Sequence, residues 1–372
     1  MISSYNNSNG FETFIALEAD VNLDFAKSVD SLMERYESSL KENGISADSA
    51  LFIRFHLSDA TTQTEQLLEG VSDRLPNTFL SVINQPPASG SKIAMEAYLA
   101  GSADNRFNKQ VNCDAVIVDH GKYKSIWGSL SPDGNSTTYD QTSEILESLS
   151  GYVSKHGGTV KDNVVRTWFY VRDIDNNYQG MVDSRREWFE RAGMTRDTHY
   201  IASTGIEGST MCHRKMTIMD YLAVIGITPD QMEFMTALDH LCPTHQYNVT
   251  FERGTRIIYG DRAHYFISGT ASIDNNGDVL HIGDVIKQTE RTLKNISVLL
   301  ENHEATLEDM KLIMVYLRDG SDYTRVNDYL QKNLPPSIAY TIVTGAVCRP
   351  SWLIEMDGIA VTDHNADFPP YC

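Results

Sequence analysis

Three stretches of the chain repeat the spacing of apolar residues that is typical of an amphipathic helix. Apolar side chains recur at i, i+3, i+4 and i+7 in FAKSVDSLMERYESSL (25–40), YDQTSEILESLSGYVSK (139–155) and DVIKQTERTLKNISVLLEN (284–302). Because an α-helix turns once every 3.6 residues, this spacing collects the apolar positions on one side. We therefore predict three helices, each with one buried face.

A similar segment follows each of these helices. The chain turns and then enters a run rich in β-branched and aromatic residues, which is typical of a strand. These runs end at Asp59, Asp173 and Asp319, which lie 15, 16 and 16 residues after the turns. The agreement in spacing indicates an internal repeat, and a repeat of this kind determines the whole fold.

Each copy of the repeat continues with a second helix and two closing strands. The second helices are predicted over residues 61–75, 182–193 and 322–334. Opening strands precede the first helix of copies two and three, at 115–130 and 255–273, whereas copy one shows a single clear opening strand, FETFIALEA. The fold class is therefore α+β, with three tandem βαβαββ units of which the first is degenerate.

The repeat divides the chain into three domains. We place the first, degenerate unit at 1–105, the second at 106–230, and a linker helix with the third unit at 231–372. The linker helix is expected in PDQMEFMTALDHL.

Composition and charge exclude several classes of partner. Hydrophobic residues make up 41% of the 372 residues, and no apolar run approaches the roughly 20 residues that cross a bilayer. The N-terminus lacks the features of a secretory signal, so a cytoplasmic location is the default expectation. The net charge of −19 repels phosphate backbones and argues against nucleic acid. Five widely spaced cysteines are expected to be free thiols.

One carboxylate distinguishes the third copy from the other two. When the final strands are aligned, all three copies carry an acidic residue at one position, namely Glu96, Asp220 and Asp357. Two residues earlier, on the same face of the strand, only the third copy is acidic, with Glu355. A carboxyl among apolar neighbours has a raised pKa and can donate a proton. The alternative is a glutamate in a buried ion pair or at the rim of the sheet.

The third copy resembles the Rid family of imine deaminases. The matching residues include ISGTASI (267–273), VYLRD (315–319) and the final strand LIEMDGIAV. The resemblance implies trimers with active sites at subunit interfaces. It therefore also implies that three such units in one chain can close a pseudo-trimer as a monomer, or assemble further as a homo-oligomer. Deaminases of this family carry an arginine fifteen residues before the glutamate of the last strand, and this chain has Tyr340 there. That departure argues against imine hydrolysis.

A longer resemblance, to chorismatases, covers nearly the whole chain. It rests on VVRTWFYV (164–171), the TGI turn at 204–206, the ISGTA strand and the final strand with its two carboxylates. It implies a cofactor-free enzyme that cleaves the enolpyruvyl ether of chorismate, a dianion, with Glu355 as general acid. The pair Gly269 and Cys348 resembles the pair found in the branch that forms 3-hydroxybenzoate, whereas two alanines are found in the branch that forms a diol. The alternative product is 4-hydroxybenzoate.

Further residues are candidates for the substrate pocket. Arg318 and Arg253 are the expected carboxylate clamps, although Arg318 could also be a charge at a strand end. Arg166 lies in an apolar run, where it faces either the ligand or a structural carboxylate. Tyr247 resembles a tyrosine of the chorismatase pocket, and could equally be a core aromatic. Cys348 is expected to shape the pocket, with a nucleophile or a core residue as alternatives.

Other kinds of chemistry find little support. The cysteines and histidines are spaced too loosely for a standard zinc site, so we expect no metal. Walker, GxGxxG and GxSxG motifs are absent. The alternatives to a chorismatase are a Rid-type hydrolase of another enol or imine, and a ligand-binding Rid protein without activity.

Overall fold

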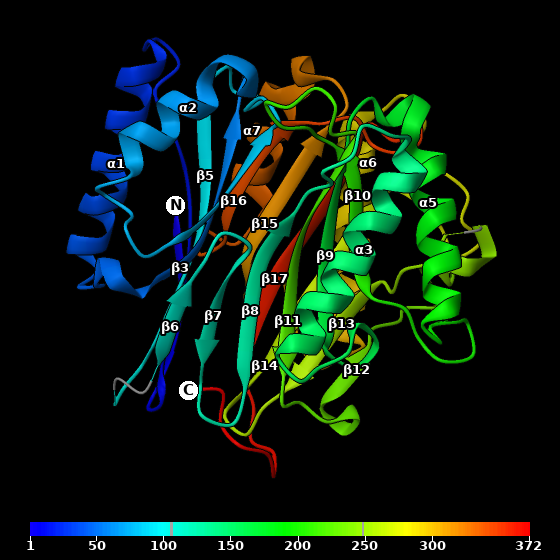
Figure 1. Cartoon of the computed structure of the whole chain (residues 1–372). Helices are drawn as coiled ribbons and strands as arrows, with labels where there is room; N and C mark the ends of the chain where they lie inside the picture. The colour runs from blue at the N-terminus through cyan, green and yellow to red at the C-terminus, as the bar shows by residue number, and fades with distance from the viewer. Residues whose placement is uncertain (105–106, 248) are drawn as a thin grey trace.

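Three sheets backed by helices build the chain, as the computed structural model shows (Figure 1). The structure describes residues 1–104, 107–247 and 249–372, without the side chain of Tyr247. In the first unit the strand order is β1-β2-β5-β3-β4. Its elements are β1 (Ile2–Asn7), β2 (Gly10–Glu18), α1 (Phe25–Glu42), β3 (Ala50–Leu57), α2 (Ala60–Val71), β4 (Phe79–Asn84) and β5 (Ile93–Ser102).

The second unit has one more strand, in the order β10-β9-β11-β8-β7-β6. Its elements are β6 (Asn108–Val111), β7 (Ala115–Asp119), β8 (Lys124–Leu130), α3 (Thr138–Lys155), α4 (Val160–Asn163), β9 (Val164–Val171), α5 (Ile174–Arg191), β10 (Ala202–Glu207) and β11 (Thr217–Ile225). Apolar side chains of α3, among them Ile145 and Leu149, are buried against the sheet, as the helical spacing predicts.

The third unit follows the same plan, in the order β12-β13-β14-β17-β15-β16. Its elements are β12 (Met232–Phe234), β13 (Gly254–Ile258), β14 (Arg262–Ala271), α6 (Val285–Glu301), β15 (Met310–Leu317), α7 (Tyr323–Asn333), β16 (Ala339–Thr344) and β17 (Ile354–Asp363). In every unit the last strand lies in the middle of its sheet and the strand before it lies parallel at an edge. The α+β prediction of three tandem units is confirmed.

Two expectations about individual elements are wrong. The first unit has two opening strands, because Ile2–Asn7 pairs with β2 along its whole length. This segment is too polar to show a strand pattern, and it is held by backbone hydrogen bonds at the edge of the sheet. The expected linker helix is absent from the described residues: a 3-10 turn at Pro229–Gln231 leads into β12, which pairs with β13. Backbone pairing with a neighbouring strand outweighs the helical spacing there.

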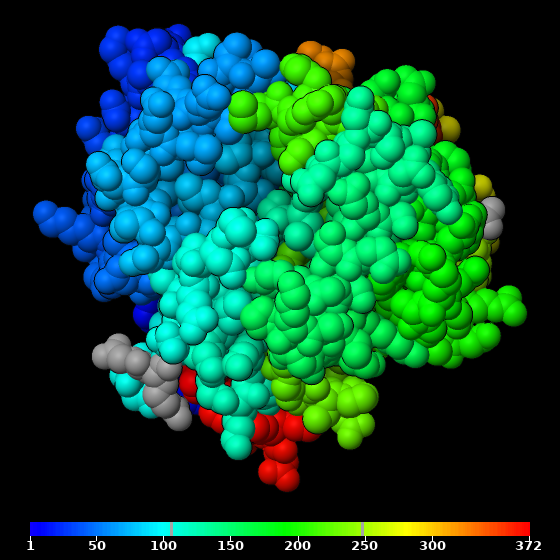
Figure 2. Space-filling model, viewed as in Figure 1, coloured from blue at the N-terminus to red at the C-terminus, as the bar shows by residue number. Residues whose placement is uncertain are grey.

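The three sheets face one another and the helices cover the outside (Figure 1). Aromatic rings from different units meet between the sheets, for example Tyr98 with Trp127 at a centroid distance of 5.0 Å and Tyr123 with Tyr259 at 5.1 Å. In the space-filling view the blue first unit and the cyan-to-green second unit meet along a seam on the visible face (Figure 2). The shared core therefore joins the units into one body.

Buried polar contacts repeat around this shared core. Ser81 in β4 donates to Asp220 of the next unit at 2.9 Å, and Thr204 in β10 donates to Asp357 of the unit after that at 2.7 Å. The registers of the parallel strand pairs place Ser81 and Thr204 at equivalent positions. These contacts join the first unit to the second and the second to the third. Strand β16 of the third unit packs against β2 of the first, so the units are arranged cyclically.

Candidate active site

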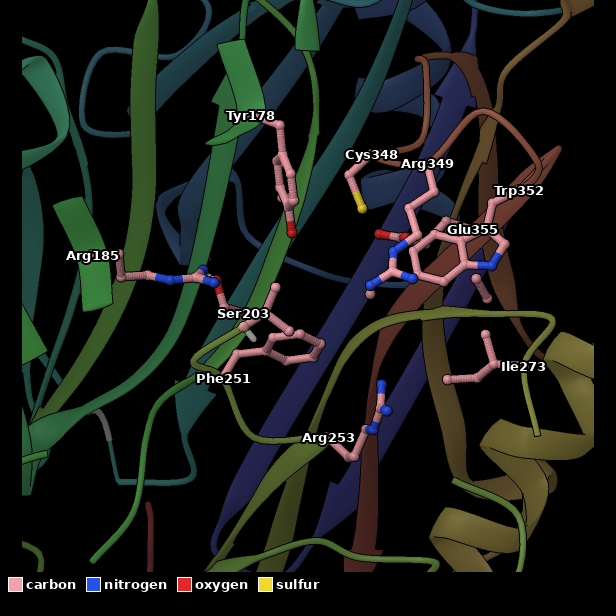
Figure 3. A pocket seen from close by; sticks show the side chains of 14 residues that line it. Tyr178, Arg185, Ser203, Phe251, Arg253, Ile273, Cys348, Arg349, Trp352 and Glu355 are labelled. Carbon is pink, nitrogen blue, oxygen red and sulfur yellow. Dashed lines mark hydrogen bonds between the residues drawn. The ribbon is translucent and has the colours of Figure 1, made fainter. Parts of the chain in front are cut away.

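A pocket of about 500 Å³, a volume that includes its opening to solvent, lies at the interface between the second and third units. Helix α5 and strand β10 of the second unit form one wall, whereas β14, β17 and the loop after β16 form the other. Figure 3 shows Tyr178 on one side, with Cys348 and Glu355 facing it from the other. Of the residues proposed from the sequence, Glu355, Cys348, Gly269 and Arg253 all line this pocket.

Glu355 is the buried acid of the pocket. It stands in β17, only 4% exposed, and pairs across the sheet with Ala271 of β14. Burial and then the nearby charge of Asp357 raise the pKa of Glu355 to about 8, although Arg166 and Arg253 act in the opposite direction. The carboxyl is therefore mostly protonated at neutral pH and can act as a proton donor.

Asp357 carries the second carboxylate of the same strand, below the pocket. It accepts hydrogen bonds from Thr204 at 2.7 Å and from the Tyr316 hydroxyl at 3.0 Å. The Arg166 guanidinium lies 3.2 Å from its carboxylate. These three partners hold Asp357 in place beside Glu355. Burial raises the pKa of Asp357, although the Arg166 guanidinium acts in the opposite direction.

Gly269 makes room for the carboxyl of Glu355. A Cβ atom at this position would lie 2.2 Å from Glu355 Oε1 and 3.2 Å from the Thr204 Cγ2 methyl. Both distances are shorter than ordinary van der Waals contacts. The absence of a side chain at Gly269 therefore leaves space for the acid itself.

We predict that Gly269→Ala lowers the rate of any reaction that needs Glu355 as the acid. The new methyl group pushes the carboxyl out of position, and a misplacement of about 1 Å can cost about 10²-fold in rate. Steady-state kinetics would measure the loss. Gly151→Ala is the matched control, because a Cβ at Gly151 meets nothing within 4 Å. Equal rates for the two variants would contradict this role of Gly269.

Three arginines line the pocket, and the sequence had pointed to only one of them. Arg253 is buried and donates two hydrogen bonds to the Cys242 carbonyl oxygen, at 2.7 and 3.2 Å. Arg349 extends from the loop after β16, with its guanidinium 5.0 Å from the Trp352 ring. Arg185 reaches in from α5. The one feature of the sequence that could have indicated Arg349 as a pocket residue is its position next to Cys348.

Two other arginines lie outside the pocket lining, contrary to expectation. Arg318 forms a bidentate ion pair with Asp175 at the start of α5, at 2.9 and 3.0 Å. Its guanidinium is thereby directed to the neighbouring unit instead of to a ligand. Arg166 is buried one layer below, paired with Asp357. Of the two roles expected for Arg166, this ion pair favours the one in which it faces a structural carboxylate, because a buried guanidinium needs an anionic partner.

Tyr247 closes a short 3-10 helix, Thr244–Tyr247. Its side chain lies outside the described part of the structure, so its proposed place in the pocket remains an expectation. The same pocket contains a tyrosine that sequence reasoning missed. Tyr178 lies in the first turns of α5, in a polar segment that showed no helical pattern, and its hydroxyl contacts the Cys348 thiol.

Cys348 has the properties of a packing residue. Loss of solvation and then the charge of Glu355 raise the pKa of its thiol to about 12. A thiol with this pKa stays protonated at neutral pH, whereas the thiolate is the reactive form of a cysteine. The nucleophile alternative is therefore not favoured. All five cysteines are free thiols.

The described residues were also compared with the requirements of a metal site and of a membrane-spanning helix. Among them, no group of three or more histidine, cysteine, aspartate or glutamate side chains is placed to hold a metal ion. Within the same part of the chain, none of the helices combines the length and apolarity needed to span a bilayer.

Comparison with known proteins places the third unit in a family. Residues 255–362 match the family model described as Endoribonuclease L-PSP. The 3-aminoacrylate deaminase RutC of Acinetobacter baylyi is 33% identical over 97 residues, which are 26% of this chain and 76% of that protein. A RutC family protein of Pyrococcus abyssi is 31% identical over 99 residues, again 26% of this chain and 76% of its own.

A second comparison covers nearly the whole chain. A crystal structure described as a chorismatase superposes with a TM-score of 0.67, and the match covers 95% of this chain and 100% of that one. At a sequence identity of 17%, this comparison shows likeness of fold alone. The RutC relatives are similar in sequence over the third unit and share three quarters of their own length with it. The chain therefore belongs to the Rid family, which includes the L-PSP and RutC proteins.

Proposed function

We propose that this protein is a chorismatase, which cleaves the enolpyruvyl ether of chorismate and releases pyruvate and a hydroxybenzoate. The observation that carries the proposal is the buried, mostly protonated carboxyl of Glu355 in a pocket lined by three arginines. Chorismate offers what such a pocket recognises, namely an enol ether that needs a proton and two carboxylates that need cations. The likeness of fold to a chorismatase supports the proposal.

The reaction begins with Glu355 as the acid. Its proton moves to the terminal CH₂ carbon of the enol ether, the C=C electron pair forms the new C–H bond, and an oxocarbenium ion results. Water adds to this cation and returns a proton to the carboxylate. Collapse of the hemiketal breaks the bond between its central carbon and the ether oxygen, the hemiketal hydroxyl becomes the ketone of pyruvate, and its proton passes to the ether oxygen, which stays on the ring as a hydroxyl. The ring keeps both oxygens as a diol, or loses one as water and becomes 3-hydroxybenzoate.

The arginines supply the cations that the dianion needs. Arg253 lies close enough to Glu355 to affect its pKa, so it would bind the carboxylate of the enolpyruvyl group, next to the carbon that is protonated. Arg185 and Arg349, on opposite walls of the pocket, would bind the ring carboxylate. In a protein with a net charge of −19, such a local group of arginines provides the attraction for an anion.

The product is proposed to be 3-hydroxybenzoate. The support is the pair Gly269 and Cys348, which both line the pocket beside Glu355 and resemble the branch that forms this product. Incubation of the purified protein with chorismate tests the proposal, with pyruvate measured enzymatically and the aromatic product identified by chromatography. We expect both products in equal amounts. Untouched chorismate, combined with turnover of an enamine such as 3-aminoacrylate, would favour a Rid-type hydrolase instead.

We predict that Cys348→Ala changes the products of chorismate cleavage more than its rate. The substitution removes volume beside the ring but leaves the acid in place, so pyruvate release should largely continue. The product mixture should shift towards the non-aromatic diol, which chromatography separates from 3-hydroxybenzoate. Loss of all pyruvate release, with unchanged thermal stability, would indicate that the thiol takes part in the chemistry.

A further inference from the structure

Tyr178 and Cys348 face each other across the Glu355 pocket, from two different units (Figure 3). Tyr178 lies in the first turns of α5, whereas Cys348 lies in the loop between β16 and β17. The Tyr178 hydroxyl donates a hydrogen bond to the Cys348 sulfur. This contact links the position of the thiol in the third unit to the position of a helix in the second.

The ring of Tyr178 is fixed by the strand behind it. A Cβ atom at Gly205 of β10 would lie 3.3 Å from the Tyr178 Cε2 atom, so the ring packs directly on the main chain of that strand. The carboxylate of Glu207, at the end of the same strand, accepts hydrogen bonds from the main-chain N–H groups of Asp173 and Ile174, at 2.9 and 2.6 Å. The start of α5 is therefore attached to β10.

The loop that carries Cys348 is joined to the same strand and the same helix. Ile206 of β10 and Val347 of the loop form an isolated antiparallel bridge. Arg318, directly after β15, donates a hydrogen bond to the main-chain oxygen of Val347. The same guanidinium forms the bidentate ion pair with Asp175 in the first turn of α5. One side chain thus connects the residue before Cys348 to the helix on the opposite wall.

The second unit shows which of these contacts belong to the repeat. Arg172 is the equivalent of Arg318, and it donates to the main-chain oxygen of Thr210 at 2.9 Å. By the registers of the parallel strand pairs, Thr210 is the equivalent of Val347. Among the described residues, the other contacts of Arg172 also go to main-chain oxygens of its own unit. The ion pair with Asp175 is therefore an addition at the pocket interface.

We propose that Tyr178 determines the product of this pocket by holding the Cys348 thiol in one rotamer, and that Arg318 is the positioning residue that keeps the two side chains within hydrogen-bond distance. The inference rests on the proposed chorismatase function, since it concerns the products of that reaction. A thiol held in one staggered position presents a constant surface to the substrate ring, whereas a released thiol occupies that position for only part of the time. The share of 3-hydroxybenzoate therefore depends on the Tyr178 hydroxyl.

Tyr178→Phe tests the proposal, because it removes the hydroxyl and keeps the ring against Gly205. The diol and 3-hydroxybenzoate are each measured per pyruvate released, so that a change in overall rate does not affect the readout. We expect the ratio of diol to 3-hydroxybenzoate to rise by about two- to tenfold, which is the size of effect that the loss of one hydrogen bond has.

The same substitution in the Cys348→Ala protein separates this role from a general effect on packing. It should change the product ratio no further there, because the thiol on which the hydroxyl acts is gone. An unchanged ratio in Tyr178→Phe would overturn the proposal, and so would an equal rise with and without the thiol.

Arg318→Gln tests the positioning role, with Arg172→Gln as the matched control at the equivalent position of the second unit. Arg318→Gln should raise the diol ratio, and it should add little to Tyr178→Phe, since both act through the same thiol. Arg172→Gln removes the same charge and should leave the ratio unchanged. Asp175→Asn removes only the ion pair between the units, and should reproduce the effect of Arg318→Gln even if that variant folds poorly.

Melting curves of all variants show whether they are folded. Equal ratios in Asp175→Asn and the natural protein, or an equal rise in Arg172→Gln and Arg318→Gln, would remove Arg318 as a positioning residue. Failure of the proposed function looks different, because the natural protein would then release no pyruvate, and this inference would fall with it. Pyruvate release with a product ratio that no Tyr178 variant alters would overturn this inference alone.

Discussion

The Glu355→Gln variant is expected to release pyruvate from chorismate about 10²–10⁴ times more slowly than the natural protein, because removal of a positioned general acid has an effect of this size. Glutamine keeps the shape of the side chain but has no acidic proton to donate. A coupled assay for pyruvate measures the rate. Unimpaired release by a correctly folded variant would show that another group protonates the substrate.

The pH dependence provides a second readout of the same group. Since the pKa of Glu355 is about 8, the proton-donating form is lost as the pH rises through this value, and the rate of the natural protein should fall there. Folding stability should respond in the same direction. The folded pKa lies above the unfolded value of 4.5, so the contribution of the protonated carboxyl is complete below pH 4.5 and is lost as the pH rises through about 8. Glu355→Gln should lack both changes.

Arg253→Gln is expected to produce the second-largest effect, mainly on KM for chorismate. A charge-assisted hydrogen bond to a carboxylate contributes about 1.5–3 kcal/mol, so its loss should weaken substrate binding by about 10- to 150-fold. Because Arg253 also lowers the pKa of Glu355, the basic limb of the pH profile should move to higher pH in the variant. Steady-state kinetics over a range of pH measures both.

Arg74→Gln serves as the control for this experiment. Arg74 pairs with Glu37 at 2.7 Å on the surface of the first unit, away from the pocket. Its removal changes the net charge by the same amount but should leave KM nearly unchanged. A similar rise in KM for both variants would indicate a general effect of charge, and would remove Arg253 as a binding residue.

Local patterns were sufficient for most of the secondary structure. The buried stripes of α1, α3 and α6 follow the helical spacing, because one face of each helix packs on a sheet. The spacing of apolar residues did not predict a helix where few of its side chains are buried. The first turns of α5 read IDNNYQG, which is polar and mostly not buried, so the helix was expected to begin at 182 instead of at Ile174. Tyr178, a residue of the pocket, was missed for that reason.

The sequence by itself determined the repeat, the α+β class and the choice of Glu355, because equivalent positions in three copies can be compared without coordinates. Only the tertiary structure decided which arginines surround the acid. The sequence made Arg318 and Arg253 equal candidates for binding a substrate carboxylate. In the structure Arg318 pairs with Asp175 of the second unit, which directs its guanidinium away from the pocket. The role of Gly269 was likewise hidden, since a distance of 2.2 Å to Glu355 depends on two strands being neighbours. Contacts between units far apart in sequence are set by packing, and no local pattern encodes them.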